Sequence, residues 1–375
     1  MPIKVLIVDD SLFMRQLISR MLSCAPDVTV LDTAKDGHAA LEKIARLKPD
    51  VVTLDLEMKG LDGLTTLKRI MTEHPTPVVI LSAYSQEDAD ITLQCLDAGA
   101  VSFLLKPSGE LSLNIETVRD QLIEQIKEAS KVNVGKIKSL IAKSEDIPKC
   151  GLVDIDKVVV IGASTGGLQS LEVILSSLPG DFPAPIIIAQ HVPSITYTEG
   201  IAKRFQKICR LVVKVAEDYE HIRPGTVYLA PAGYNMSLEQ HAVIARTLSE
   251  PFDFAQDRLR ESKGTRQSSA TIHLKSEPVD PRRHHITPSI DTTMKAVAEV
   301  YKENMLGIIL TGMGSDGVIG MGFIKELGGK TVTQDESSLI FGMPKEVIDA
   351  GFADVVLPLE KIADEMMKFV KMPSS

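Results

Sequence analysis

The stretch VLIVDDS, residues 5–11, decides the fold of the first third of the chain, because a short apolar run ends there in two adjacent carboxylates. A short apolar run bounded by polar residues is typical of a strand buried on both faces of a parallel sheet. Similar runs recur with amphipathic stretches between them. The predicted strands are Ile3–Val8, Val28–Thr33, Val51–Leu54, Val78–Leu81 and Ser102–Leu105, and the predicted helices are Leu12–Leu22, His38–Leu47, Gly63–Met71 and Asp88–Leu96. This alternation predicts an α/β domain with a doubly wound parallel sheet.

Charged residues fall at the predicted carboxyl ends of these strands. Asp9 and Asp10 follow the first strand, Asp55 the third and Lys106 the fifth. The carboxyl ends of parallel strands meet at one edge of a sheet, so we expect three carboxylates and one ammonium to lie together. Such carboxylates repel one another unless a hard cation such as Mg²⁺ neutralises them, and a carboxylate beside Mg²⁺ can accept a phosphoryl group. The alternative is that loop aspartates such as Asp10 and Asp62 only begin helices.

The segments VLIVDDS, VVTLDLEM, LDG, LSA and LLKP resemble the receiver domain of two-component response regulators over about residues 3–125. The resemblance implies a flavodoxin-like fold for this domain, and it implies that Asp55 accepts the phosphoryl group. It also implies a Mg²⁺ ion in the receiver domain, bound by Asp9, Asp10 and Asp55 together with the main-chain carbonyl of Glu57.

The same resemblance implies which residues respond to phosphorylation. Ser82 and Phe103 would form the switch pair, and Lys106 would contact the phosphoryl group. Lys59 stands where the family usually has proline, which leaves the acidic residues unchanged. A receiver further implies a histidine kinase as the source of the phosphoryl group.

The α/β pattern changes after about residue 110. Leu122–Ile141 is charged and helix-permissive, and SEDIPKCGLVDID reads as a polar connector. A second α/β series begins with VVVIGAS at Val158 and continues through PIIIAQH, TVYLAP, LGIILTG, KTVTQD and ADVVLPL, which predicts a second domain with a mostly parallel sheet. The expected divisions are a receiver domain at 1–125, a linker at 126–155 and a catalytic domain at 156–370. Residues 249–283 are rich in charge, Ser and Pro without sustained periodicity, so we expect a mobile surface insertion there.

A serine lies at the first strand-to-helix turn of the second series. Val158–Ile161 is apolar and β-branched, GASTGG follows at residues 162–167, and LQSLEVILSSL has helical character. A sharp turn of this kind exposes the serine hydroxyl, and the helix N-terminus favours negative charge. Ser164 is therefore a candidate nucleophile. The alternatives are a structural turn or a phosphate-binding turn, although GASTGG has neither the GxGxxG pattern nor the lysine of a P-loop.

A serine nucleophile requires a base, usually histidine. Only His191 directly follows a long buried-type strand of the second domain, Pro185–Ala189, so it is expected at the same sheet edge as Ser164. The other histidines lie in the receiver, at turns, or in and beside the predicted insertion: His38, His74, His221, His241, His273, His284 and His285.

The third group should be a buried carboxylate that orients the imidazole. Asp316 lies on a glycine-rich loop between a strand and a helix, whereas the rivals Asp291 and Asp335 lie in TPSIDTTMK and after KTVTQ. The glycines of the Asp316 loop indicate close backbone approach, which favours Asp316, and backbone N–H groups there could serve an oxyanion. Asp291 has the alternative of beginning a helix.

The second domain resembles the chemotaxis-type protein-glutamate methylesterases over most of residues 155–360. The matching segments are VIGASTGG, IIIAQHVP, AEDYEHIRPGTVYLAPAGYNM, TPSID and LTGMGSDGVIGMGFIKELGGKTVTQDESSLIFGMPKEVIDAGFADVVLPL. The resemblance implies Ser164 as nucleophile, His191 as general base and Asp316 as the orienting carboxylate. It implies an oxyanion-stabilising N–H from the Met313 loop, a supporting role for Thr165, and no cofactor for the esterase.

Three features depart from this family's pattern. The segment that follows Pro193 is one residue longer than usual, Asn235 replaces a usual histidine, and residues 249–283 have no recognised counterpart. The three implied catalytic residues are all present.

The resemblance implies hydrolysis of γ-glutamyl methyl esters on the cytoplasmic helices of methyl-accepting chemotaxis receptors, with deamidation of receptor glutamine as a related reaction. The implied partners are these receptors and a chemotaxis histidine kinase. Two other functions stay open: a catalytically silent regulator whose second domain only binds a receptor or output partner, and a nucleotide-dependent enzyme that uses GASTGG.

Composition narrows the class of protein. A hydrophobic content of 44% with 24% charged residues indicates a globular protein, and the net charge of -9 disfavours nucleic acid as a partner. No apolar run approaches the roughly 20 residues that span a bilayer. The N-terminus has no signal-peptide pattern, and the four cysteines are scattered without metal-like pairing. We therefore expect a cytoplasmic protein that associates with membranes only through its receptors.

Overall fold

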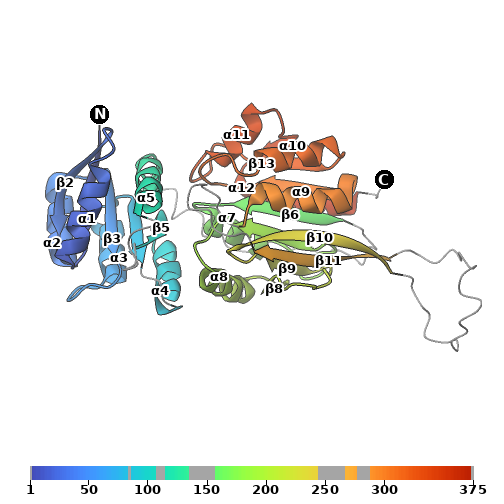
Figure 1. Ribbon diagram of the computed structural model, residues 1–375, viewed down its shortest axis with the longest axis horizontal. Helices are drawn as coiled ribbons and strands as arrows, with labels where there is room; N and C mark the ends of the chain where they lie inside the picture. The colour runs from blue at the N-terminus through green and yellow to red at the C-terminus, as the bar shows by residue number, and fades with distance from the viewer. Residues whose placement is uncertain are drawn as a thin grey trace, which may run out of the picture.

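The structure is a computed structural model that describes residues 2–82, 86–106, 115–134, 157–243, 267–276 and 288–372. Two α/β domains lie side by side along the long axis of the molecule, with the N-terminal domain at the left in Figure 1. Most of the predicted linker falls outside the described residues. None of the helices in the described ranges has the length and apolar character needed to cross a membrane.

The first domain contains a five-stranded parallel sheet in the order β2-β1-β3-β4-β5. Its strands are β1 (Ile3–Val8), β2 (Val28–Ala34), β3 (Val51–Asp55), β4 (Val78–Ser82) and β5 (Ser102–Leu105), and its helices are α1 (Leu12–Leu22), α2 (Gly37–Leu47), α3 (Gly63–Glu73), α4 (Gln86–Asp97) and α5 (Ile115–Ala129). β3 and β4 lie inside the sheet, and every residue of both strands is buried. The predicted doubly wound fold is confirmed.

Side chains that accept backbone hydrogen bonds begin the first three helices. Ser11, Asp36 and Asp62 each accept from the N–H group three residues further along the chain. Such caps satisfy amide groups that have no partner within the helix. Asp62 is therefore a helix cap, as the alternative interpretation of the loop aspartates proposed.

Helix α5 was not predicted as a helix of the first domain. It continues past the predicted boundary at residue 125, and it packs against α1 with Leu122, Ile126 and Ala129 buried. The many charged residues of α5 conceal this apolar face in the sequence.

The second domain contains a seven-stranded sheet in the order β14-β13-β12-β6-β7-β9-β8, with every strand pairing parallel. Its strands are β6 (Val158–Ala163), β7 (Ile186–Gln190), β8 (Val212–Val215), β9 (Thr226–Leu229), β12 (Met305–Ile309), β13 (Lys330–Gln334) and β14 (Val355–Leu357). This confirms the predicted mostly parallel sheet.

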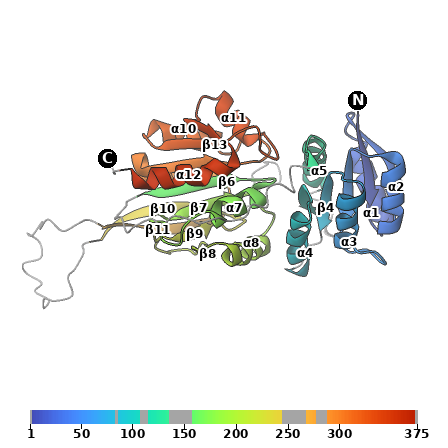
Figure 2. The same ribbon diagram turned by 180° about the vertical axis from the view of Figure 1, so that it is seen from behind.

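Helices cover both faces of this sheet, as Figures 1 and 2 show from opposite sides. One face carries α7 (Gly167–Ser176), α8 (Ile195–Ile208) and α12 (Leu359–Lys371), and the other carries α9 (Ile290–Tyr301), α10 (Val318–Glu326) and α11 (Met343–Asp349). Side chains of β6 alternate between the two cores: Val159 and Ile161 join the first, Val158 and Val160 the second. This alternation follows from the period of two along a strand.

An antiparallel ribbon of β10 (Tyr234–Val243) and β11 (Gln267–Ser276) lies beside α9. The prediction of an irregular insertion at 249–283 is therefore wrong for β11. Ala270 and Ile272 are buried and Leu274 is partly buried, which is the period of two that a half-buried strand requires. The polar start of β11, Gln267–Ser269, conceals this short alternation. The rest of 249–283 lies outside the described residues.

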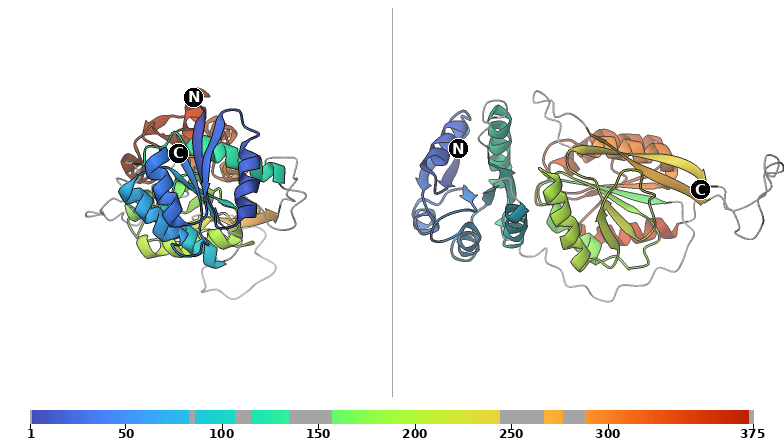
Figure 3. Two further views of the ribbon diagram at one scale, coloured as in Figure 1. Left: turned by 90° about the vertical axis from the view of Figure 1, so that its left-hand side faces the viewer. Right: turned by 60° about the horizontal axis from the view of Figure 1, so that its bottom comes forward.

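The two domains meet through a buried interface between α4 and α8. Arg204 of α8 forms ion pairs with Asp97 of α4 and with Glu172 of α7, and it donates a hydrogen bond to the Leu93 carbonyl at 3.0 Å. The apolar core of the first domain continues through this contact into α7 and α8. Figure 3 (right) shows α4 and α5, in teal, on the side of the first domain that faces the second.

Candidate active site

The three predicted catalytic residues follow three neighbouring strands of the second sheet. Ser164 follows β6, His191 follows β7, and Asp316 lies in the loop after β12. β6 lies between β12 and β7, so the direction in which strands are added reverses at β6. Ligands of open α/β sheets bind at such a reversal, outside the carboxyl ends of the strands. The sheet topology therefore gathers residues that are far apart in the sequence.

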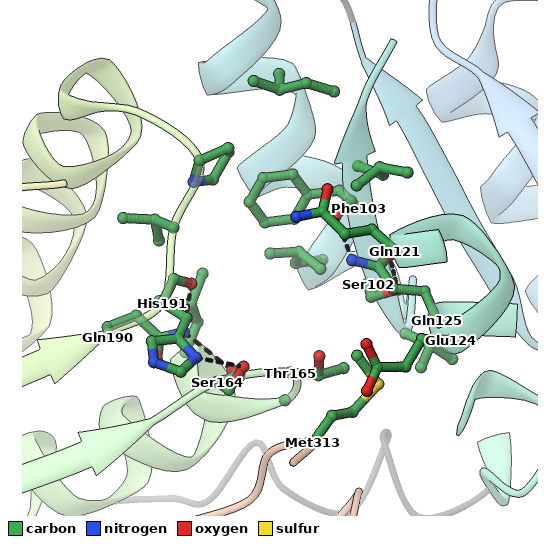
Figure 4. Close-up of a pocket in the computed structure, with 18 of the residues that line it drawn as sticks. Ser102, Phe103, Gln121, Glu124, Gln125, Ser164, Thr165, Gln190, His191 and Met313 are labelled. Carbon is green, nitrogen blue, oxygen red and sulfur yellow. Dashed lines mark hydrogen bonds between the residues drawn. The ribbon is translucent and has the colours of Figure 1, made fainter. Parts of the chain in front are cut away.

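His191 joins the other two residues through its two ring nitrogens. Its Nδ1 lies 3.2 Å from Ser164 Oγ, and its Nε2 lies 2.9 Å from Asp316 Oδ2. Figure 4 shows the imidazole beside the serine. A proton on Nε2 would be donated to the carboxylate and would leave Nδ1 free to accept from the serine hydroxyl, which is the tautomer that a general base requires.

Asp316 is held by the start of α9. Its carboxylate accepts from the N–H groups of Ile290 at 2.8 Å and Asp291 at 2.9 Å, and the Ser289 hydroxyl lies at 3.4 Å. Burial alone would raise the pKa of Asp316, but the hydrogen bond and charge of His191, together with these N–H groups, lower it below its usual value. Asp316 therefore remains ionised beside His191.

The rival carboxylates occupy other positions. Asp291 Oδ1 accepts from the N–H groups of Gly317 at 2.9 Å and Gly320 at 2.6 Å, at the start of α10. Asp335 accepts from the N–H of Ser337 within its own turn. Neither has a hydrogen bond to His191 among the described residues. Asp291 lies in the first turn of α9, but Ser289 caps that helix, and Asp291 accepts from the start of α10 instead.

Asn235 supports the same region from β10. Its buried side-chain oxygen accepts from the N–H of Ser289 at 2.9 Å, directly before α9 begins. The asparagine that departs from the family pattern thus helps to fix the helix start that holds Asp316.

Two glycines allow the turn at Ser164. Gly166 has a φ of +78°, a backbone conformation that residues with a side chain rarely adopt, and a Cβ on Gly312 would lie 2.7 Å from Ser164 Cβ.

The Ser164 N–H donates to the Thr311 carbonyl at 3.1 Å, so it is not available to an oxyanion. The N–H groups of Thr165 and Met313 donate to no residue in the described ranges. They are the candidate oxyanion donors.

A cavity of about 180 Å³ lies between the domains and reaches Ser164 and His191. The second domain contributes Ser164, Thr165, Gln190, His191 and Met313 to its lining, and the first contributes Phe103, Gln121, Glu124 and Gln125. Figure 4 shows the two sets facing one another. The first domain therefore forms the wall opposite the candidate nucleophile.

Tyr197 of α8 connects this interface to the predicted switch residues. Its hydroxyl lies 3.1 Å from Ser82 Oγ, which also accepts from Thr92 Oγ1 at 3.0 Å. Its ring stacks on Phe103 with centroids 4.8 Å apart and planes 17° from parallel. Tyr197 and Ser82 are both buried. One side chain of the second domain thus contacts both members of the predicted switch pair.

The acidic residues of the first domain come together as predicted. Carboxylate oxygens of Asp9, Asp10 and Asp55 lie within 4.8 Å of one another, and Lys106 Nζ lies 2.6 Å from Asp55 and 3.0 Å from Asp9. Burial raises the pKa of Asp55 to about 6, with Lys106 opposing the rise and Asp9 adding to it. An oxygen-only set with this excess of negative charge fits Mg²⁺. The Glu57 N–H donates to Asp55 at 3.2 Å, while the ligand role of its carbonyl stays a prediction.

Sequence reasoning missed Gln190 and Tyr197. Gln190 has one signal, since it is the polar residue that ends an apolar strand directly before His191. Tyr197 has none, because its spacing within α8 matches an ordinary core position and its partners belong to the other domain.

Fold and site together define a response regulator whose second domain has the architecture of a hydrolase. The CheB methylesterase family model matches residues 159–366, and the response regulator receiver domain model matches residues 5–116. The chain belongs to the CheB methylesterase family, whose members are hydrolases.

Two relatives of similar length support this membership. A protein-glutamate methylesterase/protein-glutamine glutaminase of Thermotoga maritima is 38% identical over 375 residues, which cover 98% of each chain. A relative of the same name from Halalkalibacterium halodurans is 40% identical over 373 residues, covering 98% of this chain and 99% of the relative. The crystal structure of the Thermotoga maritima CheB methylesterase catalytic domain is 37% identical, covers 57% of this chain and 98% of that chain, and has a TM-score of 0.47.

Proposed function

We propose that the chain is a phosphorylation-activated protein-glutamate methylesterase. It hydrolyses γ-glutamyl methyl esters on the cytoplasmic helices of chemoreceptors to glutamate and methanol, and it deamidates glutamine at the same centre. A histidine kinase supplies its phosphoryl group. The observation that carries the proposal is the hydrogen-bonded series from Ser164 through His191 to Asp316. Family membership and the names of the relatives support it.

The catalytic cycle begins when Ser164 Oγ attacks the ester carbonyl carbon while His191 Nδ1 takes the hydroxyl proton. Asp316 stabilises the imidazolium through its Nε2–H. The N–H groups of Met313 and Thr165 donate to the negative charge that develops on the former carbonyl oxygen. Collapse of this intermediate breaks the bond to methanol, which takes the proton from His191. Water then attacks the acyl-enzyme with His191 again as base, which releases glutamate and restores Ser164.

Control by the first domain follows from the contacts of Tyr197. A phosphoryl group on Asp55 would bind Lys106 and draw the Ser82 hydroxyl toward it, but Ser82 here accepts a hydrogen bond from Tyr197. We call the arrangement in which Tyr197 bonds to Ser82 and the domains are in contact the closed arrangement. Phosphorylation and the closed arrangement compete for the Ser82 side chain. Phosphorylation therefore favours separation of the domains and access to the cavity. A Mg²⁺ ion held by Asp9, Asp10, Asp55 and the Glu57 carbonyl would neutralise charge during phosphoryl transfer.

Substitution of the three catalytic residues tests the chemistry. Ser164→Ala, His191→Ala and Asp316→Asn should each lower demethylation of purified receptor by about 10³-fold or more, because such groups act as a unit. Ser177→Ala is the matched control, since Ser177 lies in the same domain and its hydroxyl donates to the Val173 carbonyl within α7. Full activity of a folded Ser164→Ala protein would contradict the Ser164 mechanism. Absence of demethylation by the wild-type chain would leave the silent regulator as the better account.

A phosphoryl donor tests the control. Acetyl phosphate with Mg²⁺ should raise esterase activity of the whole chain, and Asp55→Ala should abolish the increase. Asp62→Ala removes a nearby helix cap and should retain the increase. If the donor phosphorylates Asp55 without any change in hydrolysis of a small soluble ester, the receiver acts as a docking module for kinase or receptor.

A further inference from the structure

Gln190 ends β7 directly before His191, and only 5% of its surface is exposed. Its Nε2 donates to the main-chain carbonyl of Ser164 at 2.9 Å and to that of His191 at 3.1 Å. Figure 4 shows Gln190 beside His191 at the cavity wall of the second domain. One amide group therefore bonds to the peptide groups of both the nucleophile and the base.

The register of the sheet shows why this link matters. β6 and β7 pair as far as Ala163 and Gln190, so Ser164 and His191 lie just beyond the end of the ladder. One backbone bond follows, from the His191 N–H to the Ala163 carbonyl at 3.0 Å. Past that bond, the Gln190 amide joins the main chains of the two segments, beside the side-chain contact between Ser164 and His191.

The orientation of the amide is fixed by its surroundings. A reversed amide would direct Oε1 at two carbonyl oxygens, which cannot donate. In the observed orientation Oε1 lies toward Gly167, where a Cβ would approach it to 2.3 Å. The Gly167 N–H donates to the Ser164 carbonyl at 2.8 Å, so that carbonyl accepts from α7 and from Gln190 together.

Stability alone does not explain a glutamine at this position. Oε1 is buried without a hydrogen-bond partner among the described residues, and a buried unpaired acceptor opposes folding. An apolar side chain of the same shape would fill this space without that acceptor, but it would lose both bonds to the catalytic peptide groups.

We propose that Gln190 is a positioning residue that fixes the separation of Ser164 Oγ and His191 Nδ1 during attack. This inference rests on the proposed function. The two atoms are 3.2 Å apart, near the long end of a hydrogen bond, so small displacements of either peptide group weaken proton transfer.

The first experiment compares Gln190→Met with the wild-type full-length chain. Methionine keeps the length of the side chain and removes both donors. The burst rate of an activated ester, which reports acylation of Ser164, should fall about 10- to 100-fold, with KM within about twofold. Gln206→Met is the matched control, because the Gln206 amide also bridges two main-chain groups, the Leu211 carbonyl and the Val213 N–H, away from the cavity. It should leave the burst rate unchanged.

The second experiment uses pH to separate positioning from packing. A protonated glutamate can donate one hydrogen bond, whereas an ionised one would repel both carbonyls. Division by wild-type activity at each pH removes the pH dependence that the two chains share. The ratio of Gln190→Glu activity to wild-type activity should therefore rise as the pH is lowered. A packing role predicts a ratio that does not change with pH.

The outcomes separate this inference from the proposed function. A wild-type burst rate in folded Gln190→Met, or a flat activity ratio for Gln190→Glu, overturns the positioning role. If the wild-type chain shows no hydrolysis that depends on Ser164, the proposed function fails and the inference fails with it. Should Gln190→Met not fold, the pH series of Gln190→Glu decides the matter, with Gly167→Ala as a second variant that displaces Oε1 and should also slow the burst.

Discussion

Asp316 and Asp291 each accept backbone hydrogen bonds from the start of the other's helix. Asp316, directly before α10, accepts from Ile290 and Asp291 at the start of α9, and Asp291 accepts from Gly317 and Gly320 at the start of α10. Each carboxylate thus lies at a helix N-terminus, where negative charge is stabilised. These reciprocal hydrogen bonds join α9 to α10, and one of the two carboxylates, that of Asp316, also contacts His191.

Removal of Asp291 should therefore affect both stability and catalysis. Asp291→Ala leaves two N–H groups of α10 without an acceptor and should lower the free energy of unfolding by about 1–2 kcal/mol. It should also lower kcat about tenfold, because the loop that carries Asp316 loses its anchor. Asp36→Ala removes the cap of α2 and should cost similar stability with unchanged ester hydrolysis. Unchanged kcat in Asp291→Ala would limit its role to stability.

Loss of the Tyr197 hydroxyl should weaken the closed arrangement. Tyr197→Phe keeps the ring against Phe103 and removes the bond to Ser82, which is worth about 0.5–1.5 kcal/mol. Basal ester hydrolysis and phosphorylation by acetyl phosphate should therefore both rise about two- to tenfold. Tyr228→Phe removes another buried hydroxyl of the same domain and should change neither rate. Identical rates in Tyr197→Phe and wild type would contradict a competition for Ser82.

The pKa of Asp55 predicts how stability depends on pH. Burial raises this pKa to about 6, so the folded chain holds the proton more tightly than the unfolded chain, whose pKa is about 3.9. Stability should therefore fall as the pH rises from about 4 to about 6. In metal-free buffer at pH 8, Asp55→Asn should be more stable than wild type by about 2–3 kcal/mol in urea unfolding.

Two changes of condition should reduce this difference. Lowering the pH toward 4 protonates Asp55 in both states, and added Mg²⁺ stabilises the ionised carboxylate. An advantage of Asp55→Asn that is the same at every pH would show that burial of this charge is not its cause.

The ribbon strand β11 should contribute to stability. Ile272 is fully buried beside α9, so Ile272→Ala should lower the free energy of unfolding by about 2–5 kcal/mol. Lys275→Ala changes an exposed residue of the same strand and should have an effect below about 0.5 kcal/mol. Equal stability of the two variants would show that β11 adds little to the core.

The sequence predicted the parts of the fold that depend on buried, β-branched runs. β1 and β5 have the predicted bounds, and a charged residue directly follows each of them, Asp9 and Lys106 respectively. Ser164, His191 and Asp316 could be found because each directly follows such a run or the glycine-rich loop after it. Their roles stay predictions, whereas their proximity is a property of the structure.

The remaining features depend on contacts between distant segments. α5 and β11 were missed because polar residues surround a narrow apolar face in each. The Gln190 amide acts through main-chain carbonyls, which leave no residue-type signal in the sequence. Tyr197 contacts the other domain, and nothing in its local pattern indicates a partner that is 115 residues away in the chain.

The central position of β6 constrains the order of events during synthesis. β6 is the first strand of its domain to leave the ribosome, but it pairs with β7 on one side and with β12 on the other. Its second edge stays open until Met305–Ile309 has been made. An open edge can pair with another chain, so a nascent chain halted between β7 and β12 would be prone to aggregate. Such a fragment would already carry Ser164 and His191 without Asp316. On the proposed mechanism, full hydrolase activity would therefore begin only after translation has passed residue 316.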